Sequence, residues 1–274
     1  MLEHQPRGFG LRVVADAGQQ DRIRVRDQLP IALDHVRPGD RIDLAIDHPQ
    51  RHLTALHRAD PALTLHAPLY VHQAANGFRY VNGTPADCMH IALTGLLGYR
   101  PDLVVSGINN GANMGDDTIY SGTVGAAMEG YLFGIPAIAF SQTEKGWAHI
   151  DAAGRKAREL VQQVIAQKLG ADKPFLLNVN IPNRPFEELG PFEVCRLGRR
   201  HAAEKVISQD SPRGDTMYWI GSAGAAKDGA QGTDFHATAQ GNVSVTPLKV
   251  DLTDHDGLRD WASTMARPAA PGAA

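Results

Sequence analysis

The sequence predicts a layered α/β fold, and two observations carry that prediction. Downstream of residue 63, short runs rich in β-branched and aromatic residues alternate with runs of helical length. Strands separated by helices of this length pair in parallel and are covered by those helices. The chain has 274 residues, of which 43% are hydrophobic, so it is long enough to bury a core. We expect one large domain, or one domain with an extension, built on a mainly parallel sheet.

Each element follows from a local pattern in this part of the chain. The expected strands are the β-rich runs at 78–83, 101–109, 134–141, 175–182 and 192–198. The expected helices lie between them, at 85–97, 123–133 and 149–169. We expect Ser121 or Thr123 to cap the second helix, because a hydroxyl at that position accepts a hydrogen bond from a free backbone N–H.

Residues 232–248 break the alternation of strands and helices. They read as two strands joined by a turn at Gly241-Asn242. Glycine and asparagine favour the tight turns that join antiparallel strands. We therefore expect an antiparallel β-hairpin appended to the α/β core.

Small polar residues are concentrated at 106–123, between an apolar run and a helix-like run. This segment holds four glycines, three asparagines and two adjacent aspartates. In open α/β sheets, ligands bind at the loops that follow the carboxyl ends of the strands. A helix amino terminus there, with its free N–H groups, suits a phosphate. Two interpretations remain open on these grounds: a phosphate site, or a surface loop whose Asn, Gly and Asp residues make turns.

Composition and motifs argue against several other classes of protein. The formal net charge of −3 argues against a nucleic-acid partner. Cys88 and Cys195 form no CxxC pair, so neither a disulfide scaffold nor a zinc ribbon is indicated. No apolar run reaches the length of a membrane span, and we expect a cytoplasmic protein without a membrane partner. The GxGxxG, GxxxxGKS/T and GxSxG motifs of dehydrogenases, P-loop NTPases and serine hydrolases are missing from the sequence.

One stretch resembles a known family. The run PDLVVSGINNGANMGDDTIYSGTVGAAMEG, at residues 101–130, is similar to the signature of the SurE family, the survival-protein E nucleotidases. The resemblance continues through VNGTPADCMHIALTGLL, GIPAIAFS, LNVNIP and GTDFHATAQGNVSVTPLKVDLT, so that it covers residues 63–253. It implies a Rossmann-like three-layer core with a mainly parallel sheet, and a carboxyl-terminal β-hairpin extension used in oligomer contacts. The implied assembly is a homodimer or homotetramer.

The resemblance also implies an activity and a site. The implied reaction is metal-dependent hydrolysis of nucleoside 5′-monophosphates, in some members of 3′-monophosphates or polyphosphate. The implied cofactor is one divalent cation, Mg²⁺ or Mn²⁺. Asn109 matches the asparagine that binds this metal in the family. The phosphate pocket of the family is matched by Asn113, Ser121, Gly122 and Thr123.

Residues 1–62 do not match the pattern of the family. They contain nine Arg, five His, eight Asp, one Glu and no Lys. Family members begin with a strand ending in Asn-Asp-Asp-Gly, whose aspartates are the principal metal ligands, and a later stretch supplies a serine ligand. Neither stretch is found in this sequence.

Three explanations of this departure stay open. In the first explanation, residues 1–62 are a frameshifted or mis-joined start, because a GC-rich gene translated in the wrong frame gives this composition. Alternatively, LRVVADAG is a degenerate first strand that places Asp16 at its carboxyl end as a metal ligand. Third, the chain is a relative that binds phosphate compounds without hydrolysing them. At the other end, residues 254–274 are expected to form a carboxyl-terminal tail.

Five further residues have weaker signals. We interpret Asp116 and Asp117 as turn or helix-approach residues rather than metal ligands. His201 and Arg213 lie in family-like loops, where contact with substrate and an ordinary surface role both remain open. Cys88 is expected to be a small buried residue within a helix.

Overall fold

A six-stranded sheet forms the centre of the protein. The structure, a computed structural model, describes residues 11–13, 62–73, 79–146, 148–200, 204–221 and 224–266. The strand order in the sheet is β1-β4-β5-β6-β10-β7. These strands are β1 (Leu11–Val13), β4 (Val104–Asn110), β5 (Ala137–Gln142), β6 (Leu176–Ile181), β10 (Val243–Pro247) and β7 (Phe192–Val194). Strands β1, β4, β5 and β6 run parallel, β10 runs antiparallel to β6, and β7 is parallel to β10. The predicted α/β fold with a mainly parallel sheet is confirmed.

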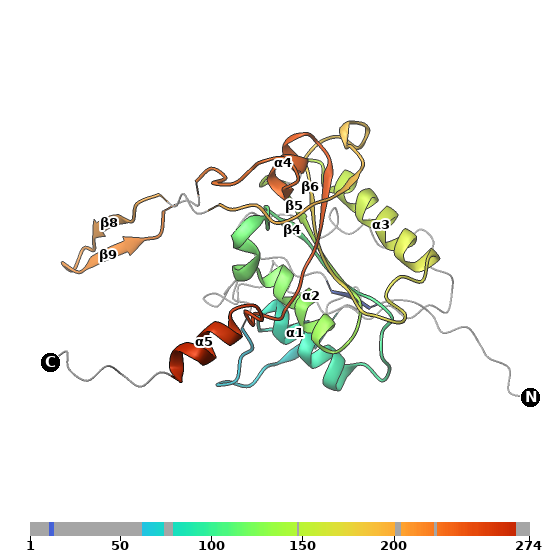
Figure 1. Cartoon of the computed structure of the whole chain (residues 1–274), viewed down its shortest axis with the longest axis horizontal. Helices are drawn as coiled ribbons and strands as arrows, with labels where there is room; N and C mark the ends of the chain where they lie inside the picture. Colours follow the sequence, from blue (N-terminus) through green and yellow to red (C-terminus); the bar gives the residue numbers. More distant parts are fainter. Residues whose placement is uncertain are drawn as a thin grey trace, which may run out of the picture.

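Helices cover both faces of this sheet and make the fold three layers thick (Figure 1). One face carries α3 (Ile150–Ala166). The other carries α1 (Pro85–Ile91), which continues as one π-helical stretch over Ala92–Leu96, and α2 (Gly122–Leu132). All three lie where the sequence predicts helices, and the cap of α2 is Ser121, whose hydroxyl accepts from the N–H of Val124 at 3.1 Å.

The side chains of β5 alternate between the two cores. Ile138 and Phe140, both fully buried, pack in the core beneath α3. Ala137 and Ala139 point to the opposite face and pack in the core beneath α1 and α2. Because neighbours on a strand point to opposite faces, a strand covered on both sides reads as a continuous apolar run. This explains why the run at 134–141 carried such a clear strand signal.

Two small antiparallel sheets accompany the central one. Strands β2 (Val71–Gln73) and β3 (Arg79–Val81) form the first. Strands β8 (Ile207–Asp210) and β9 (Thr216–Trp219) form the second, a hairpin that extends away from the body of the molecule (Figure 1). Short 3-10 helices span Gly115–Tyr120 and Phe186–Glu188. The expected tail at 254–274 contains a helix, α5 (Leu258–Met265).

The hairpin predicted at 232–248 is wrong in its first half. Residues Asp234–Ala239 form helix α4, capped by the hydroxyl of Thr233, which accepts from the N–H of His236. Gly241, at φ 86°, ends this helix rather than turning a hairpin. Glycines with a positive φ commonly end helices, because they have no Cβ that would clash with the backbone. The second half, β10, enters the central sheet, so residues 232–248 form a helix followed by a strand rather than a hairpin.

Strand β1 lies at one edge of the central sheet. Its register pairs Leu11 with Val104 and Val13 with Ser106. This agrees with the strand part of the second explanation for residues 1–62. Asp16 lies outside the described residues, so its role as a metal ligand stays a prediction. Of the helices that the structure describes, none combines the length and the apolar character that crossing a membrane requires.

Candidate functional site

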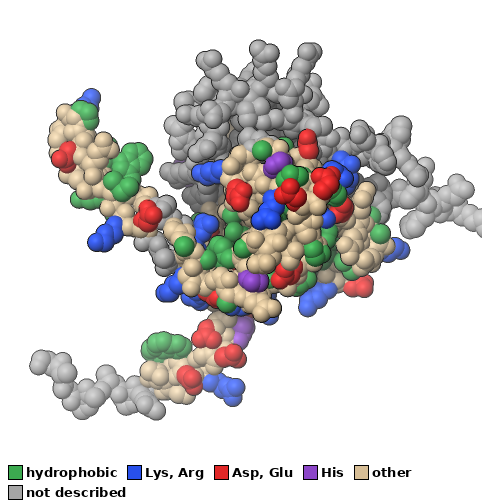
Figure 2. All heavy atoms as spheres, turned by 90° about the horizontal axis from the view of Figure 1, so that it is seen from above, with side chains coloured by type: hydrophobic (Ala, Val, Ile, Leu, Met, Phe, Trp, Pro, Cys, Tyr) green, Lys and Arg blue, Asp and Glu red, His purple; other side chains and the backbone are tan. Residues whose placement is uncertain are grey.

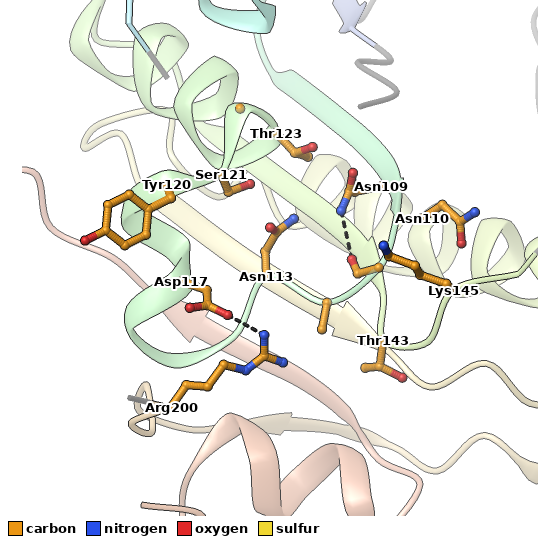
Figure 3. A pocket seen from close by; sticks show the side chains of 13 residues that line it. Asn109, Asn110, Asn113, Asp117, Tyr120, Ser121, Thr123, Thr143, Lys145 and Arg200 are labelled. Carbon is orange, nitrogen blue, oxygen red and sulfur yellow. Dashed lines mark hydrogen bonds and ion pairs between the residues drawn. The ribbon is translucent and has the colours of Figure 1, made fainter. Parts of the chain in front are cut away.

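The candidate site is a cavity at the carboxyl end of β4 and the amino end of α2. Its volume is about 430 Å³. This is the edge of the sheet at which open α/β folds bind their ligands. Figure 3 shows side chains from several separate segments converging there. The lining residues are Asn109, Asn110, Gly111, Ala112, Asn113, Asp117, Tyr120, Ser121, Gly122, Thr123, Thr143, Lys145 and Arg200.

The route of β4 into this cavity depends on a glycine. Gly107 has φ 109°, and a Cβ placed on it would stand 2.2 Å from the backbone oxygen of Phe140 on β5. No other residue fits so close an approach at a positive φ. The pairing of β4 with β5 shifts register between Ser106 and Asn109. This irregularity brings Asn109 and Asn110 to the cavity wall.

Asn109 has a free oxygen in an oriented amide. Its Nδ2 donates to the carbonyl oxygen of Gly111 at 2.8 Å. That hydrogen bond fixes the amide plane and leaves Oδ1 without a partner among the described residues. An amide oxygen of this kind can accept from a ligand or coordinate a hard cation.

Asn113 is held by a network of buried polar groups. Its N–H donates to Asn180 Oδ1 at 2.9 Å, and its carbonyl oxygen accepts from the side chains of Asn178 and Asn180 at 2.7 and 3.1 Å. Its Nδ2 donates to Ser141 Oγ at 2.7 Å. An amide nitrogen carries two hydrogens, so one donor remains for a ligand. These partners come from β5 and β6, which makes Asn113 a rigid part of the wall.

The amino terminus of α2 presents backbone donors to the cavity. Ser121 is its cap, and the N–H of Gly125 already donates to the carbonyl oxygen of Ser121 at 2.8 Å. Within the described chain, the N–H groups of Gly122 and Thr123 have no partner. A helix start leaves such donors unpaired, and its dipole favours an anion beside them. The sequence Ser-Gly-Thr therefore places two backbone donors without a described partner at the cavity, an arrangement suited to an anionic group.

Arg200 and Asp117 form the wall opposite this helix start. Arg200 Nη1 pairs with Asp117 Oδ2, and the backbone N–H of Arg200 donates to Asp116 Oδ2 at 3.4 Å. Both aspartates belong to the 3-10 helix Gly115–Tyr120, in agreement with the helix-approach role expected for them. The guanidinium lies 5.8 Å from the ring centre of Phe235.

The segment that carries Arg200 is fixed by two acidic residues. Asp234, fully buried, accepts from the N–H groups of Gly115 and Gly198 at 2.7 and 2.8 Å. It thereby joins the 3-10 helix to the segment that precedes Arg200. Asp228 accepts from Arg196 at 2.8 Å, and this hydrogen bond lowers the pKa of the Asp228 carboxyl below its ordinary value. The carbonyl oxygen of Asp228 also accepts from the N–H of Arg199.

The structure brings the predicted residues Asn109, Asn113, Ser121, Gly122 and Thr123 into one cavity. Their roles toward metal and phosphate stay predictions. Of the weaker candidates, Arg213 lies exposed between β8 and β9 and does not line the cavity, and His201 lies outside the described residues. Cys88 is buried within α1, as expected.

Outside the predicted segment 106–123, sequence reasoning missed three lining residues: Thr143, Lys145 and Arg200. Thr143 and Lys145 follow the carboxyl end of β5, next to that of β4. Their place at this edge of the sheet was a signal that could have found them. Arg200 had no such signal, because its position depends on contacts of the segment after β7.

The described residues do not fit a tightly bound divalent cation. In the parts of the chain that the structure describes, no three His, Cys, Asp or Glu side chains come together as a candidate metal centre. Asp117, the carboxylate that lines the cavity, is paired with Arg200. The lining offers neutral oxygens such as the amide oxygen of Asn109, but no cluster of carboxylates, which Mg²⁺ and similar hard cations prefer among their several oxygen ligands. The arrangement is suited to holding an anion with backbone N–H groups and two basic side chains.

Comparison with known proteins agrees with this geometry. The model of the family described as Survival protein SurE matches residues 36–204. The 5′-nucleotidase SurE of Variovorax paradoxus is 74% identical over 206 residues, which are 75% of this chain and 82% of that protein. The protein of the same name from Albidiferax ferrireducens is 73% identical over 206 residues, 75% of this chain and 81% of that protein.

A solved structure shows the same likeness in three dimensions. The crystal structure of the SurE protein from Aquifex aeolicus superposes with a TM-score of 0.72 at 32% sequence identity. The superposition covers 93% of this chain and 100% of that one. Its fold agrees with the three-layer arrangement described above. By sequence and by structure, the chain belongs to the SurE family.

Proposed function

We propose that this protein hydrolyses nucleoside 5′-monophosphates to a nucleoside and phosphate. The observation that carries the proposal is the cradle at the amino end of α2, where Gly122 and Thr123 line the cavity and their N–H groups have no partner in the described chain. A phosphate monoester is the kind of anion that such a helix start binds. The relatives named 5′-nucleotidase SurE, at 74% and 73% identity, support the same reaction class.

The residues of the chain account for binding and orientation of the phosphoryl group. The backbone N–H groups of Gly122 and Thr123 donate to its oxygens, which also stabilises the charge that develops on them during hydrolysis. Asn113, fixed by Asn178, Asn180 and Ser141, presents its remaining amide hydrogen in a set orientation. Because these donors are held before substrate arrives, little reorganisation accompanies the reaction.

We also predict that this hydrolysis depends on Mg²⁺ or Mn²⁺. Asn109 would supply one ligand through Oδ1, and the described residues supply no carboxylate cluster beside it. We therefore derive no step through a metal. The lack of a carboxylate cluster among the described residues also favours a second candidate function, in which the protein binds phosphate compounds or nucleotides without turnover.

Phosphate release from 5′-AMP and 5′-GMP separates the two functions. The full chain is assayed with Mn²⁺, with Mg²⁺ and with EDTA, beside Asn109→Ala. Gln163→Ala, which removes an exposed amide from α3 far from the cavity lining, is the matched control. Turnover that requires metal and Asn109 but not Gln163 supports the nucleotidase. A folded protein that binds 5′-AMP and releases no phosphate under any of these conditions supports the binding function instead.

The finer features are proposed in the same way. Parallel assays with 3′-AMP and polyphosphate define the range of phosphate esters. A homodimer or homotetramer is proposed, with the β8–β9 hairpin as its contact surface. The cytoplasm remains the predicted location.

A further inference from the structure

Lys145 reaches the cavity from the side opposite the 3-10 helix. It lies just beyond the carboxyl end of β5, while the cradle is formed by α2. Figure 3 shows its nitrogen turned toward Asn109 and the interior of the site. Its stem runs beside the backbone, with Cγ 3.9 Å from the point where a Cβ on Gly111 would stand. That distance is an ordinary van der Waals separation, so the stem of Lys145 lies directly beside Gly111.

The loop that carries Lys145 is tied to the loop after β4 on both sides of the lysine. Gly146 donates its N–H to Asn110 Oδ1 at 2.8 Å, and its carbonyl oxygen accepts from Gln142 Nε2 at 2.6 Å. Before the lysine, the carbonyl oxygen of Gln142 accepts from the N–H of Gly111 at 3.0 Å. These hydrogen bonds hold the backbone at Lys145 in place, although its side chain is exposed.

The two basic side chains of the cavity differ in their charge balance. Arg200 is paired with Asp117, so that wall is close to neutral. Lys145 has no acidic partner among the residues that the structure describes. A lysine ammonium is positively charged near neutral pH. The uncompensated positive charge in this part of the lining therefore belongs to Lys145.

We propose that Lys145 is a further substrate-binding residue, whose ammonium contacts the phosphate held at the amino end of α2. A dianionic phosphate leaves acceptor capacity after two backbone N–H groups have donated to it. A charge-assisted hydrogen bond from an ammonium is stronger than one from a neutral donor. The inference rests on the phosphate-binding part of the proposed function and needs no turnover.

The test is binding of inorganic phosphate to the full chain in EDTA, measured by isothermal titration calorimetry. Lys145→Gln is expected to raise the dissociation constant about tenfold, the size expected for losing one charge-assisted hydrogen bond. Lys145→Arg keeps the charge and is expected to stay within about threefold of the parent. Lys173→Gln removes an exposed lysine outside the cavity lining and is expected to bind as the parent does.

Glu144→Gln separates direct contact from a general effect of charge. This neighbour changes the local charge by the same amount, and contact predicts that it leaves phosphate affinity unchanged. An increase in affinity that mirrors the loss in Lys145→Gln overturns the proposal. So does unchanged affinity in Lys145→Gln, or a parent protein that does not bind phosphate.

A second measurement uses the unaltered protein, in case Lys145→Gln fails to fold. Amine acetylation is followed by mass spectrometry with and without inorganic phosphate. Phosphate is expected to slow the modification of Lys145 and to leave that of Lys173 unchanged. Equal effects on the two lysines overturn the proposal. If phosphate binds through Lys145 while 5′-AMP is never hydrolysed, the nucleotidase proposal fails and the inference stands.

Discussion

Ser121 has two roles at one position, because the cap of α2 is also part of the cavity wall. Its hydroxyl accepts from the N–H of Val124. The N–H groups of Gly122 and Thr123, which line the cavity, have no partner in the described chain. Ser121→Ala is expected to lower the free energy of unfolding by about 1 kcal/mol, the usual cost of a lost helix cap. Urea denaturation followed by circular dichroism measures this loss.

The same position separates stability from binding. Ser121→Asp keeps a capping oxygen and is expected to retain the parent stability, but its carboxylate repels phosphate and binding is lost. Ser263→Ala, on the exposed helix α5, is the control for removing a serine hydroxyl. Parent-like phosphate affinity in Ser121→Asp would contradict the placement of phosphate at this helix start.

Cys195 gives a prediction about pH at the residue scale. Burial raises the pKa of its thiol above the ordinary value of 9.0, and the hydrogen bond with Thr246 opposes this only in part. The folded state therefore holds the proton more strongly than the unfolded state. The resulting stabilisation is fully present below pH 9.0 and is lost as pH rises through the higher pKa of the folded protein.

Urea unfolding at pH 8 and pH 10 measures this effect. The parent is expected to lose more stability over that interval than Cys195→Ala, which has no thiol to titrate at this position. Comparing the two proteins cancels the contribution of the other groups that titrate there. Equal losses would show that the thiol has the same pKa in both states.

At the scale of elements, Asp234 joins three segments that are distant in sequence. It accepts from the N–H groups of Gly115, Gly198 and Phe235, the last at 2.9 Å. Asp234→Ala leaves these donors without their acceptor, and each buried unpaired donor costs about 1 to 3 kcal/mol. We expect a loss of about 3 kcal/mol or more in the free energy of unfolding, measured with urea.

Asp234→Asn is the finer probe of the same junction. It keeps one acceptor oxygen and replaces the other with a donor, so its loss should be smaller than that of Asp234→Ala. Asp210→Asn, on the exposed strand β8, is the matched control and should leave stability unchanged. If Asp234→Asn were as stable as the parent, the three hydrogen bonds would not be what fixes the 3-10 helix beside the cavity.

The error at 232–248 shows what local pattern cannot distinguish. A short amphipathic helix and a short strand give similar signals over six residues, and Gly241 fits either a helix end or a turn. The decision is made by tertiary contacts: Asp234 is buried and accepts from Gly115 and Gly198, which are distant in the sequence. Such contacts are not visible in the sequence of that segment.

At the scale of the whole molecule, the predictable part is the part with strong periodicity. The strands that became β4, β5 and β6 begin with apolar runs, and the helices between them have helical length, so their parallel direction followed. The helix start at Ser121 was predictable because a capping hydroxyl comes directly after a strand and a loop. Lys145 was missed although its place just beyond the carboxyl end of β5 was a usable signal, whereas Arg200 reaches the cavity through contacts of the segment after β7 that form only on folding.

Contacts within a single chain do not account for the stability of the β8–β9 hairpin. Every residue of both strands is exposed, including Ile207, Met217, Tyr218 and Trp219. Figure 2 shows apolar side chains gathered on this projection, away from the body of the protein. An isolated two-stranded hairpin is only marginally stable in water, and an exposed apolar patch of this kind indicates an interface. We expect a second copy of this chain to cover it.

The prediction is that the full chain forms a homodimer or homotetramer through this hairpin. The double variant Tyr218→Ser, Trp219→Ser removes the two aromatic side chains and is expected to reduce the molar mass from light scattering to that of one chain. Leu132→Ser, on the exposed end of α2, is the control for losing an exposed apolar residue. This chain supplies thirteen lining residues by itself, and we expect the monomeric variant still to bind phosphate. A parent protein that already runs as a monomer would refute the assembly, and a double variant that keeps the parent mass would place its interface elsewhere.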